Sequence, residues 1–415
     1  MKRISTLLFF IAVFFSTQAQ AARWQVLLYM DSSDEMSDMA IKNITDLLRA
    51  KIDDTVEFLI QLHAYDTVAL RYTVSSQGLT FVQEHQLRDS ARTNLEEAAH
   101  WAFADSAADY RMLIFWNHGW GILDPRWNAS ASEWQVNALQ ESDACPIKRS
   151  IALEEHKRHR GYMFSTTPRT YLSNQDMIQA LSHIKKNILG DKKIDVIAFD
   201  TCMGGMLEVA YQLESYASYL VGIQVCSLMD GFDYTGLLTA LKNRPTPSAL
   251  VQDLIHILDE YYQIHDANGV YAYTALDLSL ISSLVDALNT VARTLLKMDD
   301  GIPFALEAHN TTPRFCTFTM YTDLISYIKQ VEVQARAHST TAHMHELLSA
   351  IELLYQAMEQ CLVARCAGYA NYDKTHGCAI YAPMYAVDES YYATPFAQAS
   401  QWLDLLEAVA KRALP

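Results

Sequence analysis

Several features that mark particular protein classes are missing from this sequence. Its seven cysteines include no Cys-x-x-Cys pair, the spacing typical of structural zinc sites and redox-active dithiols, so neither kind of site is supported. The chain contains no low-complexity tract and no internal repeat. Charged residues are scarce at 19%, and half of the residues are apolar, which indicates a globular protein with ample material for a core.

Positive charge is also scarce. The 32 Lys and Arg residues face 48 Asp and Glu residues, which gives a net charge of −16. So acidic a composition argues against nucleic acids and anionic membranes as partners. It suits cationic ligands such as peptides that carry Arg or Lys, although acidity also keeps ordinary proteins soluble.

An apolar run near the start of the chain is short. Residues 7–15 follow the basic pair Lys2 and Arg3 and precede a small-x-small site, Ala19-Gln20-Ala21. This order is typical of a cleaved secretion signal, and the run is too short to span a bilayer. We therefore expect residues 1–21 to be removed and the mature chain to be exported to a bacterial periplasm or to the medium, without a membrane anchor.

Strand-like and helix-like segments alternate from residue 24 onward. Apolar runs predict strands at residues 25–30, 57–63, 70–75, 111–116, 195–199 and 219–224. Between them, helices are predicted at residues 36–49, 93–107, 174–189 and 205–215. This alternation predicts an α/β fold with a mostly parallel sheet covered by helices on both faces.

Two of the predicted strands end on side chains with complementary chemistry. Residues 195–199 lead to Cys202 and a Gly-Gly pair ahead of a predicted helix, and residues 112–116 lead to His118, followed by a glycine. Sites in open α/β sheets form outside the carboxyl ends of the strands, and a helix N-terminus near Cys202 would favour its thiolate. Together the two residues predict a cysteine nucleophile with a histidine base, although each alone is more often structural.

Both blocks resemble those of the clostripain-like cysteine peptidases, relatives of caspases, legumains and gingipains. Trp-Asn-His-Gly at residues 116–119 is similar to their histidine block. Phe-Asp-Thr-Cys-Met at residues 199–203, followed by Glu-Val-Ala-Tyr, is similar to their cysteine block, with Thr201 in place of an alanine. Similar blocks occur at residues 24–31, 231–234 and 376–383. The resemblance implies a caspase-like sheet and spans nearly the whole mature chain.

The family also carries a smaller C-terminal domain, and the second half of this chain has a pattern of predicted helices and strands that fits such a domain. Helices are predicted at residues 248–264, 278–296 and 342–362, with strands at residues 270–276 and 378–382. We expect a caspase-like catalytic domain over residues 22–243 and a mainly helical α+β domain over residues 244–415, divided at the Asn-Arg-Pro-Thr-Pro segment.

The resemblance implies acyl transfer, in which the Cys202 thiolate attacks a peptide carbonyl and His118 transfers protons. The backbone N–H groups of Gly119 and Cys202 are the expected oxyanion hole, and glycine at position 119 would let the backbone approach the substrate. Asn117 and Asp200 flank the dyad, and no third catalytic residue stands out. No cofactor is expected. Some relatives require calcium, for which this sequence shows no ligand set.

Clostripain relatives cleave proteins after Arg, and sometimes Lys, by placing a carboxylate at the base of the specificity pocket. The matching region of this chain offers Asp230, Asp233 and Asp200, each equally well explained as a turn residue. Relatives commonly have Ser-x-Glu after the strand at residues 219–224. This chain reads Gly-Ile-Gln-Val-Cys-Ser there instead, which places Cys226 near the pocket and leaves the choice between Arg and Lys open.

Residues 123–172 form a long segment that we predict to be irregular. Segments of this length are usually functional or disordered. In a chain short of positive charge, this one holds Lys148, Arg149, Arg158 and Arg160. One interpretation is a solvated surface insertion. The other, implied by the resemblance, is an activation loop that the enzyme cuts itself after a basic residue.

Two other functions stay open on the sequence alone. The altered pocket motif also fits a peptidase-like protein that binds peptides or an envelope protein without cleaving them. A thiol oxidoreductase that uses Cys202 with a second cysteine is disfavoured by the absence of a Cys-x-x-Cys pair. In an oxidising compartment, disulfides are allowed among the six other cysteines, which are Cys145, Cys226, Cys316, Cys361, Cys366 and Cys378. Of these, Cys361 and Cys366 fall within or at the end of one predicted helix, a placement unfavourable for pairing with each other.

Overall fold

The structure, a computed structural model, describes residues 24–32, 36–50, 52–65, 67–124, 126–128, 133–135, 162–166, 169–228, 230–315, 319–338, 342–383 and 386–413. The predicted signal at residues 1–21 lies outside the described residues. So do the four basic residues proposed as cleavage positions, Lys148, Arg149, Arg158 and Arg160. The signal and the cleavage loop therefore stay predictions from the sequence.

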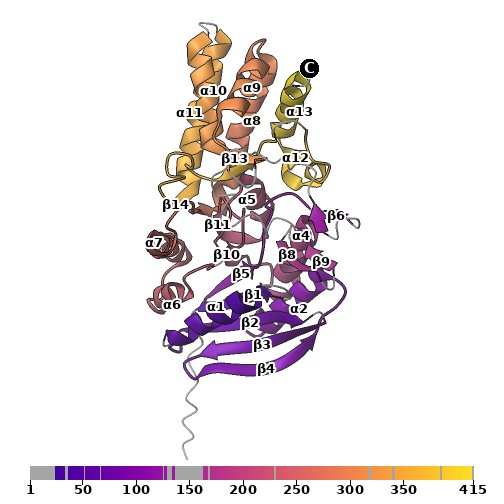
Figure 1. Cartoon of the computed structure of the whole chain (residues 1–415), viewed down its shortest axis with the longest axis vertical. Helices are drawn as coiled ribbons and strands as arrows, with labels where there is room; N and C mark the ends of the chain where they lie inside the picture. The colour runs from indigo at the N-terminus through magenta and orange to yellow at the C-terminus, as the bar shows by residue number, and fades with distance from the viewer. Residues whose placement is uncertain are drawn as a thin grey trace, which may run out of the picture.

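A nine-stranded sheet runs through the molecule in the order β14-β12-β11-β10-β5-β1-β2-β3-β4 (Figure 1). Its strands are β1 (Trp24–Asp31), β2 (Val56–Tyr65), β3 (Val68–Ser75), β4 (Gly78–Gln86), β5 (Tyr110–Trp116), β10 (Ile194–Asp200), β11 (Ala217–Ile223), β12 (Ala272–Asp277) and β14 (Leu362–Ala367). The five central strands, from β11 to β2, are parallel. Antiparallel strands extend the sheet on both sides. The predicted α/β class, with a mostly parallel sheet, is confirmed.

Helices cover both faces of the parallel strands. The connection from β1 to β2 carries α1 (Ser37–Arg49), and the connection from β5 to β10 carries α4 (Asn174–His183). Because right-handed crossovers in opposite directions put their helices on opposite faces, α1 and α4 lie on different sides of the sheet. The α1 side also holds α6 (Tyr234–Lys242) and α7 (Pro247–His265). The α4 side holds α2 (Ala91–Phe103) and α5 (Leu207–Leu213).

The second half of the chain builds a helical layer at the end of the molecule away from β4 (Figure 1). Its helices are α8 (Ile281–Lys297), α9 (Gly301–Thr311), α10 (Leu324–His338), α11 (Ala342–Cys361), α12 (Pro395–Ala399) and α13 (Trp402–Ala413). A separate two-stranded antiparallel ladder consists of β13 (Tyr321–Asp323) and β15 (Ala379–Tyr381). Among the described residues, no helix has the length and apolarity required to cross a membrane.

Some elements differ from the predictions. The helix expected at residues 342–362 ends at Cys361, and the chain continues as β14, because residues 362–367 pair with β12 at the edge of the sheet. Strands β12 and β14 therefore belong to the main sheet although they follow residue 243, and the domain division there stays a prediction. The segment at residues 123–172 is not wholly irregular, because it contains two short antiparallel pairs. These are β6 (Arg126–Asn128) with β7 (Glu133–Gln135), and β8 (Tyr162–Thr166) with β9 (Arg169–Leu172).

Candidate active site

The sheet register brings His118 and Cys202 to the same place. Strands β5 and β10 are parallel neighbours, and their last paired residues are Trp116 and Asp200. His118 and Cys202 each follow two residues later in the sequence. Since the carboxyl ends of adjacent parallel strands lie at one edge of the sheet, the two half-buried residues leave it side by side.

The surroundings of Gly119 show how closely the loop that carries His118 approaches the loop that carries Cys202. A Cβ atom at this position would lie 2.2 Å from the carbonyl oxygen of Cys202 and 2.6 Å from the Oγ1 atom of Thr201. Glycine is therefore required for contact between the histidine loop and the cysteine loop. From the sequence we expected it to leave room for a substrate, and the structure gives this different physical reason.

The environment of the Cys202 sulfur also differs from the expectation. Helix α5 begins at Leu207, so Cys202 lies well before its first turn, and the influence of a helix terminus falls off within one turn. A backbone group acts on the sulfur, because the N–H of Ser227 donates a hydrogen bond to Cys202 Sγ over 3.1 Å. Hydrogen bonds to the charged form of a group favour that form.

Asparagine side chains fix the histidine loop. Asn117 donates from Nδ2 to the carbonyl oxygen of Asp31 at the end of β1 over 2.6 Å, and its Oδ1 accepts from the N–H of His118. Asn43, fully buried in α1, accepts from Trp116 Nε1 over 2.8 Å. Asn117 therefore braces the loop, a role that the sequence left open. Asn43 was missed because nothing in its neighbourhood of the sequence marks it.

Comparisons with known proteins agree with this geometry. Residues 152–408, more than half of the chain, match the clostripain family of peptidases. The chain belongs to the clostripain family. The matched region contains Cys202 and begins after His118. Family membership makes this protein a cysteine-type endopeptidase, with peptides or proteins as its substrates.

Solved structures share the fold of this clostripain-family peptidase. A secreted C11 cysteine protease from Bacteroides thetaiotaomicron, bound to an irreversible peptide inhibitor, aligns with a TM-score of 0.64 and 15% identity over 92% of this chain and 100% of that one. A second structure of a secreted C11 protease from that organism, iotapain, aligns with a TM-score of 0.66 and 13% identity over 93% of this chain and 99% of that one. An inactive zymogen C11 protease from Parabacteroides distasonis aligns with a TM-score of 0.59 and 16% identity over 93% of this chain and 99% of that one. No curated protein matches the sequence.

The three aspartates proposed for the specificity pocket have different surroundings in the peptidase. Asp233 is the N-cap of α6, where its Oδ1 accepts from the N–H of Gly236 over 3.0 Å. Asp200 is buried, and its Oδ2 accepts from the N–H of Phe232 over 3.0 Å and from the hydroxyl of Tyr234 over 2.8 Å. Burial raises the pKa of Asp200 to about 6, although these two hydrogen bonds lower it in part.

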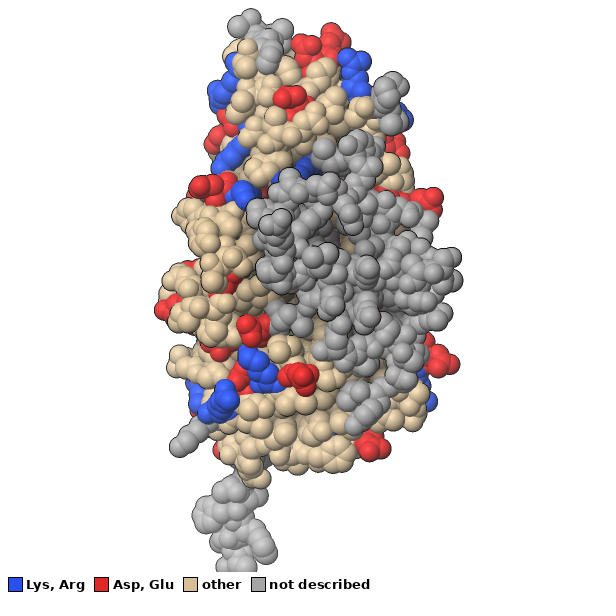
Figure 2. All heavy atoms as spheres, in the orientation of Figure 1, with Lys and Arg blue, Asp and Glu red and all other residues tan. Residues whose placement is uncertain are grey.

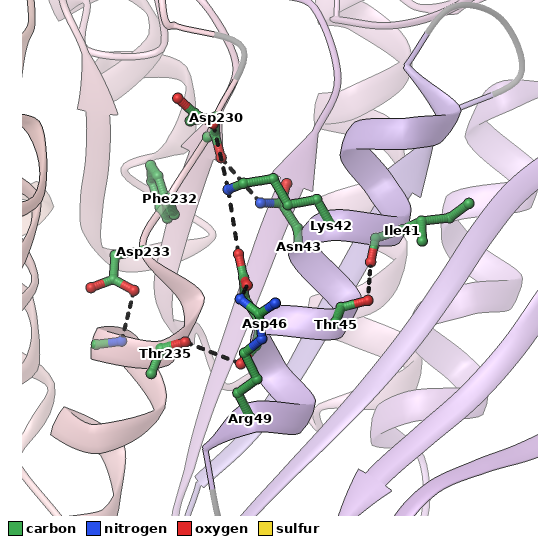
Figure 3. A network of polar contacts seen from close by, with 12 residues as sticks. Ile41, Lys42, Asn43, Thr45, Asp46, Arg49, Asp230, Phe232, Asp233 and Thr235 are labelled. Carbon is green, nitrogen blue, oxygen red and sulfur yellow. Dashed lines mark hydrogen bonds and ion pairs between the residues drawn. The ribbon is translucent and has the colours of Figure 1, made fainter. Parts of the chain in front are cut away.

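Asp230 lies beside Lys42 and Asn43 of α1 (Figure 3). Its side chain is 38% exposed, and its Oδ1 lies 3.5 Å from Lys42 Nζ. Its backbone oxygen accepts from Asn43 Nδ2 over 3.0 Å. Because Asn43 also holds Trp116, one buried amide links the segment that carries Asp230 to the strand that precedes His118.

The block at residues 376–383 packs against the segment that follows Cys202. The N–H of Ala379 donates to the carbonyl oxygen of Gly205 over 2.9 Å. The N–H of Tyr381 donates to Glu208 Oε1, in the first turn of α5, over 2.8 Å. Glu208 is fully buried, and burial raises its pKa to about 7 despite this hydrogen bond.

The described cysteines are all thiols, including Cys202, Cys226, Cys361, Cys366 and Cys378, whereas Cys145 and Cys316 lie outside the described residues. Burial raises the pKa of Cys361 and of Cys366 to about 12, so both stay protonated at neutral pH. The described part of the chain contains no cluster of three or more His, Cys, Asp or Glu that would hold a metal ion. The expectation of no cofactor, and the calcium dependence known from some relatives, both stay untested.

Charged side chains are dispersed over the face of the peptidase shown in Figure 2. Among the described residues on this face, acidic and basic groups are interspersed with uncharged ones. The described acidic residues therefore form no single patch on this face.

Proposed function

We propose that this protein is an exported endopeptidase that hydrolyses peptide bonds after Arg or Lys, with Cys202 as nucleophile and His118 as acid and base. The observation that carries the proposal is the shared register of β5 and β10, which delivers both residues to one edge of the sheet. The contact at Gly119 supports it, because it fixes the separation of the two loops.

In this mechanism the Cys202 thiolate attacks the carbonyl carbon of the scissile bond and forms a tetrahedral intermediate. The backbone N–H groups of Gly119 and Cys202 stabilise its oxyanion. His118 then protonates the leaving amine, which leaves a thioester on Cys202, and afterwards activates the water that hydrolyses it. Before the attack, the hydrogen bond from Ser227 stabilises negative charge on the sulfur.

Asp230 is the best-supported residue for binding the basic side chain of the substrate. Asp200 is buried and already accepts two hydrogen bonds, and Asp233 caps a helix. The Asp230 side chain is 38% exposed, and its carboxylate already lies near one cation, Lys42. A guanidinium or ammonium group of the substrate would pair with the same carboxylate by charge-assisted hydrogen bonds.

Export and self-processing complete the proposal. The N-terminal segment has the pattern of a secretion signal, and two proteins with this fold are described as secreted. A third is an inactive zymogen, which supports activation by a cut near the basic residues 148–160. On a denaturing gel, wild type should run as two fragments produced by a cut within that segment, whereas Cys202→Ala should run as one intact chain. A fully active, uncut wild-type chain would rule out the processing step.

The peptidase proposal is tested with fluorogenic peptides that end in Arg, in Lys or in an uncharged residue. We expect turnover of the basic peptides by wild type and none by Cys202→Ala. Cys366→Ser is the matched control, since this thiol is held protonated away from the dyad. Equal turnover by Cys202→Ala would defeat the proposal. Stoichiometric binding of an intact partner without any cleavage would favour the peptide-binding alternative.

A further inference from the structure

The segment after Cys202 runs antiparallel to the segment after β11. The N–H of Met203 donates to the carbonyl oxygen of Val225 over 3.1 Å, and that of Gly205 donates to Ile223 over 2.8 Å. The second bond lies two residues further along one segment and two residues further back along the other, which is the pattern of an antiparallel pair. Cys202 and Cys226 each lie one residue beyond the bonded pair of Met203 and Val225, at the same end of this pairing.

A third contact gives the same placement from a side chain. The N–H of Ser227, next to Cys226, donates to Cys202 Sγ over 3.1 Å. Because the Cα of a residue lies about 2.4 Å from the next amide nitrogen, the Cα of Cys226 lies within about 5.5 Å of the Cys202 sulfur. Disulfides join residues whose Cα atoms lie about 4.4–6.8 Å apart, so a Cys202 sulfur this close to the Cys226 backbone is within reach of its thiol. Both residues carry thiols and are half-buried.

The geometry points to a reversible disulfide between Cys202 and Cys226 that switches the enzyme off under oxidising conditions. This inference rests on the proposed role of Cys202 as the nucleophile. It gives a function to Cys226, which occupies the site of the altered pocket motif and is used by no step of the peptidase mechanism.

The oxidant is a small-molecule disulfide such as oxidised glutathione. The Cys202 thiolate attacks one of its sulfurs, the S–S bond breaks, and one small thiol leaves. The Cys226 thiolate then attacks Cys202 Sγ and displaces the second small thiol. Two electrons pass from the cysteines to the small disulfide, and the two thiol protons end on its products. A dithiol reductant reverses both steps and restores the nucleophile.

Both cysteines fall in one tryptic peptide, so mass spectrometry can detect a disulfide between them directly. Residues 194–242 contain no Lys or Arg before Lys242, and Cys202 and Cys226 are their only cysteines. Trypsin therefore releases both thiols in one peptide. After equilibration with oxidised glutathione, acid quenching and alkylation, the wild-type peptide should escape alkylation and weigh about 2 Da less than its dithiol form. Peptidase activity should fall in parallel and return with dithiothreitol.

Two variants separate the outcomes. Cys226→Ser should trap the glutathione adduct on Cys202, which gains about 305 Da, because no second thiol resolves it. Cys366→Ser should behave as wild type. A wild-type peptide that keeps the adduct, or that stays fully alkylated in the oxidising buffer, would overturn the inference. Mass spectrometry detects the disulfide whether or not the protein cleaves peptides. A protein that forms the disulfide but lacks peptidase activity would therefore contradict only the proposed function. An active peptidase without the disulfide would sink only this inference.

Discussion

Replacing Gly119 by alanine perturbs the contact on which the proposed site depends. The new Cβ would lie 2.2 Å from the Cys202 carbonyl oxygen and 2.6 Å from Thr201 Oγ1. Since carbon and oxygen atoms in contact are separated by about 3.3 Å, the histidine and cysteine loops must separate by roughly 1 Å. The atom in the way belongs to the backbone, so a rotamer change cannot relieve the overlap.

A displacement of this size should affect catalysis more than folding. Misplacing reacting groups by about 1 Å lowers the rate about 100-fold, equivalent to about 2.7 kcal/mol of activation free energy. Overpacking at one position costs about 1–3 kcal/mol of folding free energy. We therefore expect Gly119→Ala to remain folded and to lose about 100-fold in kcat/KM.

The assay is kcat/KM on the preferred basic fluorogenic peptide, together with the thermal unfolding midpoint. Thr201→Ala is the control, because it removes atoms from the same contact and adds none. It should retain most of the wild-type rate. Wild-type kcat/KM and an unchanged midpoint in Gly119→Ala would refute the close approach of the two loops.

Three further predictions concern the carboxylates Asp230, Asp233 and Glu208. Asp230→Asn should lower kcat/KM for Arg and Lys peptides by about 10–100-fold, the value of hydrogen bonds to a charged group, and leave uncharged peptides unaffected. In contrast, Asp233→Ala should remove a helix cap and about 1 kcal/mol of unfolding free energy without changing the ratio of rates on basic and uncharged peptides; a changed ratio would assign the pocket to Asp233. Glu208→Gln should alter the pH dependence of stability. Burial raises the folded-state pKa of Glu208 to about 7, so wild type should lose roughly 3 kcal/mol relative to the variant between about pH 4.5 and pH 7, with no difference in slope outside that window. Parallel denaturation curves at pH 5 and pH 8 measure this, and an equal loss in both proteins would exclude Glu208 as the cause.

The central strands were predictable because their burial leaves a direct mark on the sequence. Strands β5 and β10 are covered on both faces and therefore appear as continuous apolar runs. The small and polar residues that follow them mark the sheet edge where sites form. The edge strand β4 has almost only exposed residues and lacks both a run and an alternation. Strand β14 continues directly from a long helix, so its residues look like the last turn of that helix.

The bracing of the site was not predictable, because it depends on contacts between distant segments. Asn43 joins Trp116 to the backbone of Asp230, and Ser227 reaches the Cys202 sulfur from another strand end. No local pattern announces either contact. The N-cap role of Asp233, in contrast, was open to prediction, since an aspartate directly before an apolar helical segment is a standard helix start.

Labelling of Cys202 by a peptide that carries a basic residue next to a thiol-reactive group tests the central claim most directly. We expect intact-mass spectrometry to show one adduct on wild type, located on Cys202, and no adduct on Cys202→Ala. Loss of an acid–base partner lowers rates by about 10²–10⁴-fold, so His118→Ala should slow the labelling by a factor in that range. An adduct on another residue, or an undiminished rate in His118→Ala, would contradict the account.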